Sequence, residues 1–129
     1  MLQFLDSFLT VFHSALVFFI LTGWLFAKTR KIHFWTLATT LTAWLVIGYW
    51  IGTIGYCPIT DWHWDLKRSL GQRQLPGSFI KYMIDQLLGI DANREMVDII
   101  TGIGMAAATI AAVIMRIRGR RRGKKTITV

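Results

Sequence analysis

The sequence has few of the residues on which enzyme and metal chemistry usually depend. Its 129 residues include one cysteine, three histidines and seven acidic residues. A lone cysteine excludes a disulfide within the chain, and neither a second cysteine nor a paired histidine spacing is present from which a zinc site could be built. The sequence also lacks a glycine-rich phosphate loop, a carboxylate pair and a nucleophilic triad. These absences argue against an enzyme and leave the function open.

What the sequence does have is three long apolar runs. Hydrophobic residues make up 53% of the chain, and the mean hydropathy is +0.45. The runs at 8–26, 34–56 and 99–115 contain no formal charge. Each can cross a hydrocarbon core of about 30 Å at roughly 1.5 Å per residue, the third only just. We therefore predict an all-α membrane protein that forms a single membrane domain over residues 1–129. Its transmembrane helices are expected at about 5–27, 34–56 and 96–115.

Charge flanks these runs unevenly. The turn at 28–33 and the tail at 116–129 hold ten of the fifteen lysines and arginines and no acidic residue, whereas 57–95 holds five basic and five acidic residues. Lys and Arg close to a transmembrane helix are retained on the cytoplasmic side. We therefore predict an external N-terminus, an external segment 57–95, and a cytoplasmic turn and tail. The first run has no basic region before it and no small-x-small cleavage site, so we expect an uncleaved helix.

The basic tail would read as a nucleic-acid-binding arm if it were taken alone. Directly after an apolar helix, however, such a run more often rests on anionic headgroups, where each basic residue contributes about 1 kcal/mol. We therefore expect the tail to contact the lipid bilayer and not nucleic acid. Gly119 and Gly123 argue against a continuous helix in the tail.

The segment between the second and third runs is expected to form a periplasmic cap of two short amphipathic helices. Pro58 stops the second transmembrane helix. Thr60 or Asp61 is a suitable N-cap for a short helix that ends at Gly71. After a turn, apolar residues recur at three- and four-residue spacing over 79–90. This pattern predicts an amphipathic helix that lies in the membrane interface or covers the mouth of the bundle.

The start of this cap holds the one cysteine and several aromatic residues. Trp62 and Trp64 are expected at the membrane surface, where aromatic belts form. Cys57, Asp61 and His63 could be imagined as metal ligands, but their spacing does not support a metal site. Activation of Cys57 by His63 as a nucleophile is specified by nothing else in the sequence. We interpret the stretch as the exit of a helix from the bilayer, followed by an interfacial helix.

Two of the predicted transmembrane helices carry small residues four positions apart. The second contains Gly48-x-x-x-Gly52. This spacing lets helix backbones approach closely, which matters because lipid supplies no hydrophobic force between helices. We expect these faces to pack within the bundle or against another subunit. In the third helix the small residues are Gly102, Gly104, Ala106, Ala108 and Ala112.

His13 is the one ionisable residue well inside a predicted transmembrane helix, which makes it a functional candidate. Counting residues from the helix ends brings His13 level with the small residues of the other two helices. A haem ligated by His13 and Met105 would fit this alignment, and so would a quinone bonded to His13. The interpretation that we favour is a neutral histidine bonded to Ser14, a threonine or a backbone carbonyl, with no cofactor. His33 lies too far along the bundle to share a cofactor with His13.

An ordered series of residues resembles a known family. His13, His33, the CPIT motif at 57–60 and the SFIKY motif at 78–82 together resemble the small bacterial inner-membrane family known as domain of unknown function 2784. The similarity extends to about Met115. The family has no established activity, so the resemblance implies a fold and a location, the bacterial cytoplasmic (inner) membrane. The positions that it implies are important are His13, His33, Cys57, Pro58, Thr60, Phe79 and Tyr82.

The chain departs from the family pattern at two places. Family members usually have a Glu-Asn pair soon after the threonine of CPIT, where this chain has DWHW at 61–64. They also tend to have His where this chain has Lys81. These departures weaken the idea of a metal site shared across the family at those positions.

Two functions from different classes follow from these observations. The leading hypothesis is a non-catalytic small subunit or assembly factor that packs against a larger membrane complex, or against its own copies, through its small-residue faces. The alternative is a small haem- or quinone-binding redox subunit that uses His13. Binding of lipid or peptide under the 79–90 helix rests on amphipathicity alone.

Overall fold

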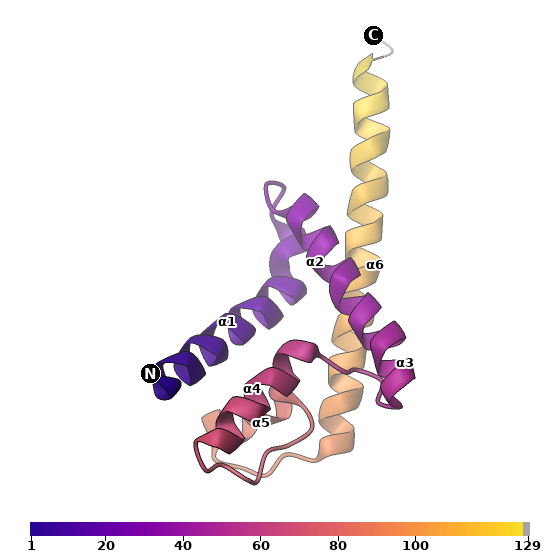
Figure 1. Cartoon of the computed structure of the whole chain (residues 1–129). Coiled ribbons are helices and arrows are strands. Elements are labelled where there is room, and N and C mark those ends of the chain that lie inside the picture. Colours follow the sequence, from indigo (N-terminus) through magenta and orange to yellow (C-terminus); the bar gives the residue numbers. More distant parts are fainter. Residues whose placement is uncertain (128–129) are drawn as a thin grey trace.

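The computed structural model describes residues 1–127, which form helices joined by short turns and loops (Figure 1). α1 (Leu2–Thr22) continues into a 3-10 turn, η1 (Gly23–Leu25). The second long element consists of α2 (Arg30–Thr42), a π-helical turn η2 (Ala43–Ile47) and α3 (Gly48–Ile51). Two short helices, α4 (Pro58–Ser69) and α5 (Phe79–Leu88), precede the long α6 (Arg94–Ile127). Residues 128 and 129 of the predicted tail lie outside the described residues.

Three elements are long and apolar enough to cross a membrane. They are Leu2–Leu25, Arg30–Ile51 and Arg94–Lys125, which confirms three predicted helices in their predicted order. The third is longer than predicted, because α6 runs through Gly119 and Gly123 to Ile127. The prediction that these glycines interrupt the helix is wrong. Each glycine costs a helix only about 1 kcal/mol, and the arginines and lysines around them have high helix propensity.

The second long apolar element ends at Ile51 and not near Tyr56, because its last turn is closed by glycine. Gly52 has a φ of +80°, the left-handed conformation that commonly ends a helix. The Thr53 N–H donates to the Gly48 carbonyl at 2.8 Å. A Cβ on Gly48 would lie 2.7 Å from the Thr53 carbonyl oxygen, so a side chain does not fit there. Gly48 and Gly52 thus end the helix, and their role in packing against another helix stays a prediction.

The two short helices were predicted close to where they occur. α4 begins at Pro58, with Cys57 as its extended N-cap residue, so the predicted N-cap at Thr60 or Asp61 is wrong. Proline is favoured at the first helical position because it has no N–H to satisfy and its φ already suits a helix. α5 begins after Ser78, whose side chain accepts a hydrogen bond from the Lys81 N–H.

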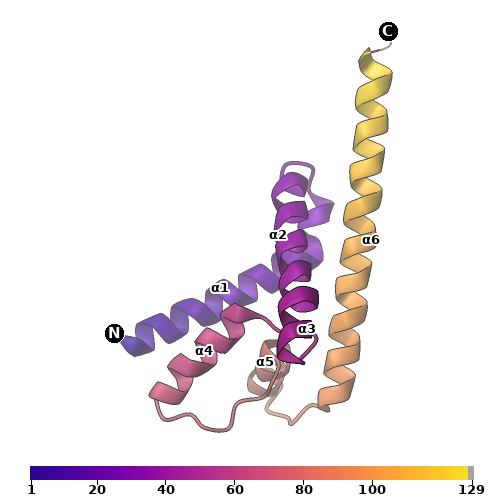
Figure 2. The same ribbon diagram turned by 45° about the vertical axis from the view of Figure 1, so that its right-hand side comes forward.

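The long helices do not form a parallel bundle. α1 is strongly inclined to α6 in both ribbon views, so the N-terminal half of α1 leads away from α6 (Figures 1 and 2). α4 lies along the N-terminal half of α1, and α5 lies between α4 and the start of α6. The main apolar core joins the long helices further along and consists of Ile20, Leu37, Met105 and Ala112.

The turn between α1 and α2 is held by His33, which is 1% exposed. Its Nε2 lies 2.7 Å from the Ile20 carbonyl oxygen, and because a carbonyl only accepts, Nε2 carries the proton. The Thr29 hydroxyl donates to the Gly23 carbonyl at 2.8 Å. A Cβ on Gly23 would lie 2.7 Å from the His33 ring, so the imidazole packs where only glycine fits. His33 therefore stabilises this turn by joining α2 to the end of α1.

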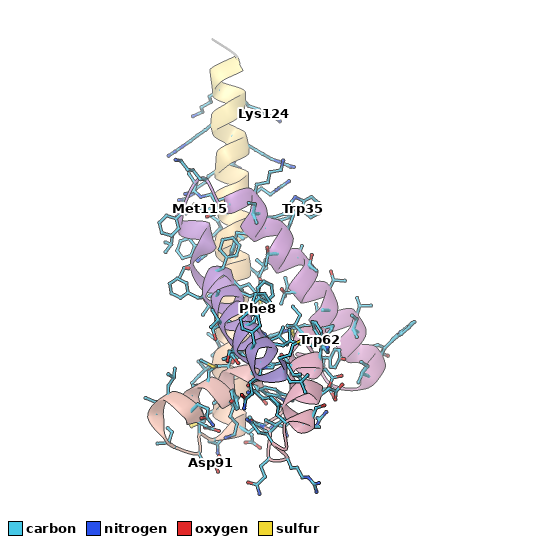
Figure 3. All side chains as sticks on the ribbon, turned by 60° about the vertical axis from the view of Figure 1, so that its left-hand side comes forward. Phe8, Trp35, Trp62, Asp91, Met115 and Lys124 are labelled. Carbon is cyan, nitrogen blue, oxygen red and sulfur yellow. The ribbon has the colours of Figure 1, made fainter. Side chains whose placement is uncertain are left out.

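Charge is separated along the molecule. All seven acidic residues lie on α4, α5, the loop after α5, or the first turns of α1 and α6. The opposite end, formed by the α1–α2 turn and the last turns of α6, carries ten basic residues and no acidic one. Figure 3 shows the two ends, with Trp62 and Asp91 at the first, Trp35 and Met115 toward the second, and Lys124 far along α6.

Candidate functional site

A buried ion pair joins α1 to α4. The Lys67 ammonium lies 2.8 Å from Asp6 Oδ1, and His63 Nε2 lies 2.7 Å from the same oxygen. Since a carboxylate only accepts, both nitrogens donate to it. His63 and Lys67 are four residues apart and so share one face of α4, where they are 0% and 2% exposed. The side chain of Asp6 is 18% exposed.

Lys67 stays charged in this environment. Burial alone would lower its pKa, but hydrogen bonds with Asp6 and Tyr82 raise the pKa above the ordinary 10.5. The ammonium also lies 4.8 Å from the centre of the Tyr82 ring, within reach of a cation–π interaction. The ion pair is thus satisfied from two sides, as buried charges need to be.

His13 lies next to this ion pair and is 5% exposed. Its ring stacks on Phe79, with centroids 4.0 Å apart and planes 8° apart. Its Nε2 lies 4.0 Å from the Cys57 sulfur. Among residues 1–127 its Nδ1 has no hydrogen-bond partner, although it is buried. None of the hydrogen bonds predicted for His13, to Ser14, a threonine or a backbone carbonyl, is formed among the described residues, and the Ser14 hydroxyl donates to the Thr10 carbonyl at 2.7 Å.

An aromatic wall closes the cluster from the side of α5. Trp64 is 5% exposed, and its indole N–H donates to the Pro76 carbonyl at 2.7 Å. Its ring contacts both Phe79 and Tyr82. The prediction that Trp64 stands in an aromatic belt is therefore wrong, whereas Trp62, which is 59% exposed, remains on the surface. We refer below to Asp6, His13, Cys57, His63, Lys67, Phe79 and Tyr82 as the polar cluster.

Comparison with known proteins identifies the family of this chain. A model of the family described as Protein of Unknown function (DUF2784) matches residues 3–117. The chain belongs to this family. No curated protein and no solved structure matches it. The matched range contains the polar cluster and all three membrane-spanning candidates up to the first residues of the basic tail.

The structure brings most of the suggested DUF2784 motif positions together. His13, Cys57, Phe79 and Tyr82 belong to the polar cluster, and Pro58 begins the helix that carries its basic residues. Thr60 is buried on the same side of that helix. His33 is the exception, since it clamps the α1–α2 turn. These residues thus hold α1, α4 and α5 together, apart from His33, which joins α1 to α2.

The structure places His13 and Met105 at different levels. Met105 packs with Ile20, which follows His13 by seven residues, or roughly 10 Å along α1. The predicted shared haem therefore lacks the alignment on which it was based. Counting from helix ends failed because α1 is inclined to α6 (Figure 2). Among residues 1–127, no three His, Cys, Asp or Glu side chains form a metal-binding group.

The small residues of α6 fall on two different faces. Ala108 and Ala112 are buried in the chain's own core region, and a Cβ on Gly104 would contact Leu21 at 3.3 Å. Gly102 and Ala106 are exposed, and a Cβ on Gly102 would meet nothing within 4 Å. Only part of the predicted packing face is therefore used within this DUF2784 chain.

Asp6 and Lys67 are important residues that the sequence analysis did not select. Local pattern does not show that two residues so far apart in the chain would pair. It does indicate which residues face the same way: the spacing of Thr60, His63, Trp64 and Lys67 puts all four on one face of a short helix. Another was an acidic residue, Asp6, close to the start of an otherwise apolar membrane helix, which needs a cationic partner.

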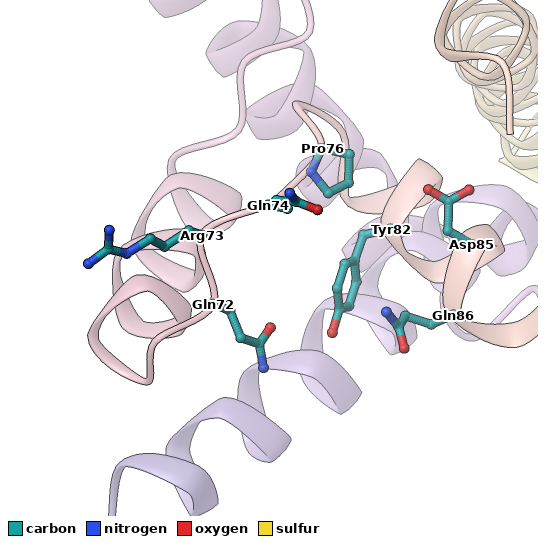
Figure 4. Close-up of a pocket in the computed structure, with 7 residues that line it drawn as sticks. All are labelled: Gln72, Arg73, Gln74, Pro76, Tyr82, Asp85 and Gln86. Carbon is teal, nitrogen blue, oxygen red and sulfur yellow. The ribbon is translucent and has the colours of Figure 1, made fainter. Parts of the chain in front are cut away.

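An open cleft of about 380 Å³ lies beside the polar cluster, between α5 and the loop that precedes it (Figure 4). Figure 4 shows Gln72 and Gln86 extending toward the Tyr82 ring, while Arg73 points away from it. Tyr82 is shared by this cleft and by the contact with Lys67. The lining offers amides and one carboxylate, a set suited to hydrogen bonding. It is formed by Gln72, Arg73, Gln74, Pro76, Tyr82, Asp85 and Gln86.

Proposed function

We propose that this DUF2784 protein is a non-catalytic small subunit or assembly factor, which packs against a larger membrane complex or against its own copies. The observation that carries the proposal is the open small-residue face of α6. Gly102 and Ala106 are four residues apart and exposed, and nothing in the described chain faces Gly102. Small residues gain nothing from facing lipid, but they allow another helix to approach closely.

The surroundings of this face suit a helix partner. Ile99 and Ile103 beside it are 61% and 64% exposed, so a partner helix would find apolar side chains next to the small residues. The polar cluster supports a structural role in addition. Its Asp6–Lys67 ion pair is buried, and both charges are neutralised, so the pair can hold α4 against α1.

We also propose that the protein lies in the bacterial cytoplasmic membrane with its N-terminus outside. In this orientation α4 and α5 form a periplasmic cap, and the basic end of α6 is cytoplasmic. The separation of charge along the molecule supports this orientation, because ten basic residues and no acidic one gather at a single end.

The decisive experiment is purification of the tagged full-length protein from its own membrane in mild detergent, followed by native mass spectrometry. A defined larger assembly would identify the partner. Gly102→Leu should reduce recovery of the partner at least about tenfold, because the larger side chain prevents the close approach of another helix. Gly123→Leu is the matched control, since Gly123 is also open and lies on the same helix. Unchanged recovery with Gly102→Leu, or a monomer from native membranes, would overturn the proposal.

A second candidate function is a haem- or quinone-binding redox subunit. The observation in its favour is the buried Nδ1 of His13, which, like the Nδ1 atoms of His33 and His63, has no partner among residues 1–127. A ligand that accepts from or binds this nitrogen would satisfy it. The preparation should then show a Soret band or extractable quinone that disappears in His13→Ala. A colourless, quinone-free preparation from native membranes would remove this candidate.

A further inference from the structure

A second cleft lies at the opposite end of the molecule from the polar cluster, between the α1–α2 turn and α6. Its volume is about 390 Å³. Four basic residues line it: Arg30, Lys31, Arg116 and Arg120. Trp24 and Phe34 add aromatic surface. We call this the basic cleft.

The positive charge of the basic cleft is not neutralised within the described chain. None of these four cations takes part in an ion pair within the described residues, and the ion pairs of Asp6, Asp65, Asp85, Asp91 and Asp98 lie at the end that carries α4 and α5. Arg30 donates to the Trp24 carbonyl at 3.1 Å, and the Arg116 guanidinium lies 4.2 Å from the centre of the Phe34 ring. These contacts orient two of the four cations without supplying negative charge. Four cations around one cleft create a positive potential that favours an anion.

The basic cleft also has an apolar side. Ala112 and Met115 line it, and Met115 is the last residue of the uncharged run that begins at Ile99. The cleft therefore stands where the apolar part of α6 gives way to charge. In a membrane this boundary coincides with the level of the lipid headgroups. Figure 3 shows Met115 near the α1–α2 turn, with Lys124 further along α6.

We propose that the basic cleft binds the phosphate of an anionic phospholipid. The guanidinium groups of Arg30, Arg116 and Arg120 match the oxygens of a phosphate. The acyl chains would follow the apolar surface below, where Ile110 and Ile114 are 60% and 41% exposed. A soluble phosphate would use the cations but not this surface, so the lipid is the occupant that the cleft fits. The inference goes beyond the subunit role and does not depend on it.

The test compares lipids retained by the full-length protein in native mass spectrometry. Nanodiscs would contain phosphatidylglycerol and phosphatidylethanolamine in equal amounts. Wild-type protein should retain phosphatidylglycerol selectively. The double variant Lys31→Gln/Arg120→Gln should retain at least about tenfold less, because two of the four cations are lost. Lys31 and Arg120 are chosen because their removal leaves the Arg30–Trp24 and Arg116–Phe34 contacts intact.

The matched control is Arg118→Gln/Arg121→Gln, which removes the same charge from α6 outside the basic cleft. It should retain phosphatidylglycerol at the wild-type level. Equal loss in both double variants would show that the tail attracts lipid without a site and would overturn the proposal. Equal retention of both lipids by wild-type protein would overturn it too. Displacement of the lipid by inorganic phosphate or pyrophosphate at equal concentration would identify a soluble anion as the occupant, against the proposal. Circular dichroism of each variant checks that the helices remain folded.

Discussion

At the scale of single residues, Lys67 is a buried charge that depends on its partners. A buried ammonium is stable only while it is paired, and the partners of Lys67 are Asp6 and the Tyr82 side chain. Asp6 comes from α1, so the pair joins a short helix to one that is long and apolar enough to cross a membrane. His63 adds a second hydrogen bond to the same carboxylate and fixes its position.

Removing the carboxylate should therefore destabilise the protein strongly. Asp6→Ala is expected to lower the free energy of unfolding by about 3 kcal/mol, because an uncompensated charge remains buried. The double variant Asp6→Leu/Lys67→Met should recover much of this loss, since it removes both charges. Denaturant unfolding in detergent, followed by tryptophan fluorescence, measures both.

Asp61→Ala serves as the control for this measurement. Asp61 lies on the same helix as Lys67 but is exposed, and its carboxylate accepts a hydrogen bond from the Tyr56 hydroxyl at 3.0 Å. Its loss should change the free energy of unfolding by less than about 0.5 kcal/mol. If Asp6→Ala lowers the free energy of unfolding by no more than this, the buried pair contributes little to stability.

Single residues also show where sequence analysis reached its limit. The three- and four-residue spacing of apolar residues predicted the helix that begins at Phe79. The ring of Phe79 stacks on His13. No local pattern relates Asp6 to Lys67, because their contact depends on how α4 lies against α1. Proximity of side chains from different helices is a property of the packing and not of either segment.

At the scale of elements, the connection between α5 and α6 is held by charge. The Lys81 ammonium lies 2.6 Å from both Asp85 Oδ2 and Asp91 Oδ1. Asp85 also accepts from the Ala92 N–H at 2.8 Å. These bonds lower the pKa of Asp85 below its ordinary 3.8 and raise the pKa of Lys81. The stabilisation from Asp85 is present above pH 3.8 and is lost as pH falls through the lowered folded-state pKa.

Asp85→Asn should accordingly remove one part of the acid sensitivity of the protein. At pH 7 the wild type should melt at a higher temperature than the variant, because only the carboxylate pairs with Lys81. Below pH 3.8 the difference should shrink as the wild-type carboxyl is protonated. Melting temperatures of both proteins between pH 3 and 7, followed by circular dichroism, measure this. A constant difference across the range would contradict the role given to Asp85.

The end of the second long apolar element gives another prediction. Gly48→Ala should destabilise the protein by about 1–3 kcal/mol, since its Cβ would lie 2.7 Å from a backbone oxygen that cannot move freely. Gly102→Ala, the same change at an open site, should be neutral or stabilising by up to about 1 kcal/mol. Thermal unfolding of the two purified variants compares them directly. The opposite ranking would restore a packing role for Gly102 within the chain.

Elements were the scale at which the sequence was most informative. The length of the uncharged runs predicted three helices able to span a membrane, and Pro58, Gly71 and the turn that follows marked the limits of the short helices. Helix ends were less predictable because they depend on local bonds. Gly52 closes the second element before its apolar run ends, and the α6 helix continues past the apolar run into a charged segment.

At the scale of the whole molecule, the inclination of α1 explains where α4, α5 and the polar cluster lie. Because α1 diverges from α6, a space opens beside its N-terminal half, and α4 and α5 fill that space (Figures 1 and 2). The polar cluster lies at this junction, whereas the apolar core lies where the long helices converge. A parallel arrangement would have brought His13 level with Met105. The inclination could not be read from residue counts, which give depth only for parallel helices.

The separation of charge between the two ends yields the last prediction, which concerns orientation. In a Cys57→Ser background, Gln72→Cys and Gly123→Cys place single exposed thiols at the opposite ends of the molecule. A membrane-impermeant maleimide should label Gln72→Cys in cells whose outer membrane is permeabilised, and it should label Gly123→Cys only after lysis. The reason is that lysine and arginine beside a membrane helix resist translocation, and ten of them gather at the Gly123 end. The reverse labelling would put the α4–α5 end in the cytoplasm, and the basic cleft would then face the outer leaflet.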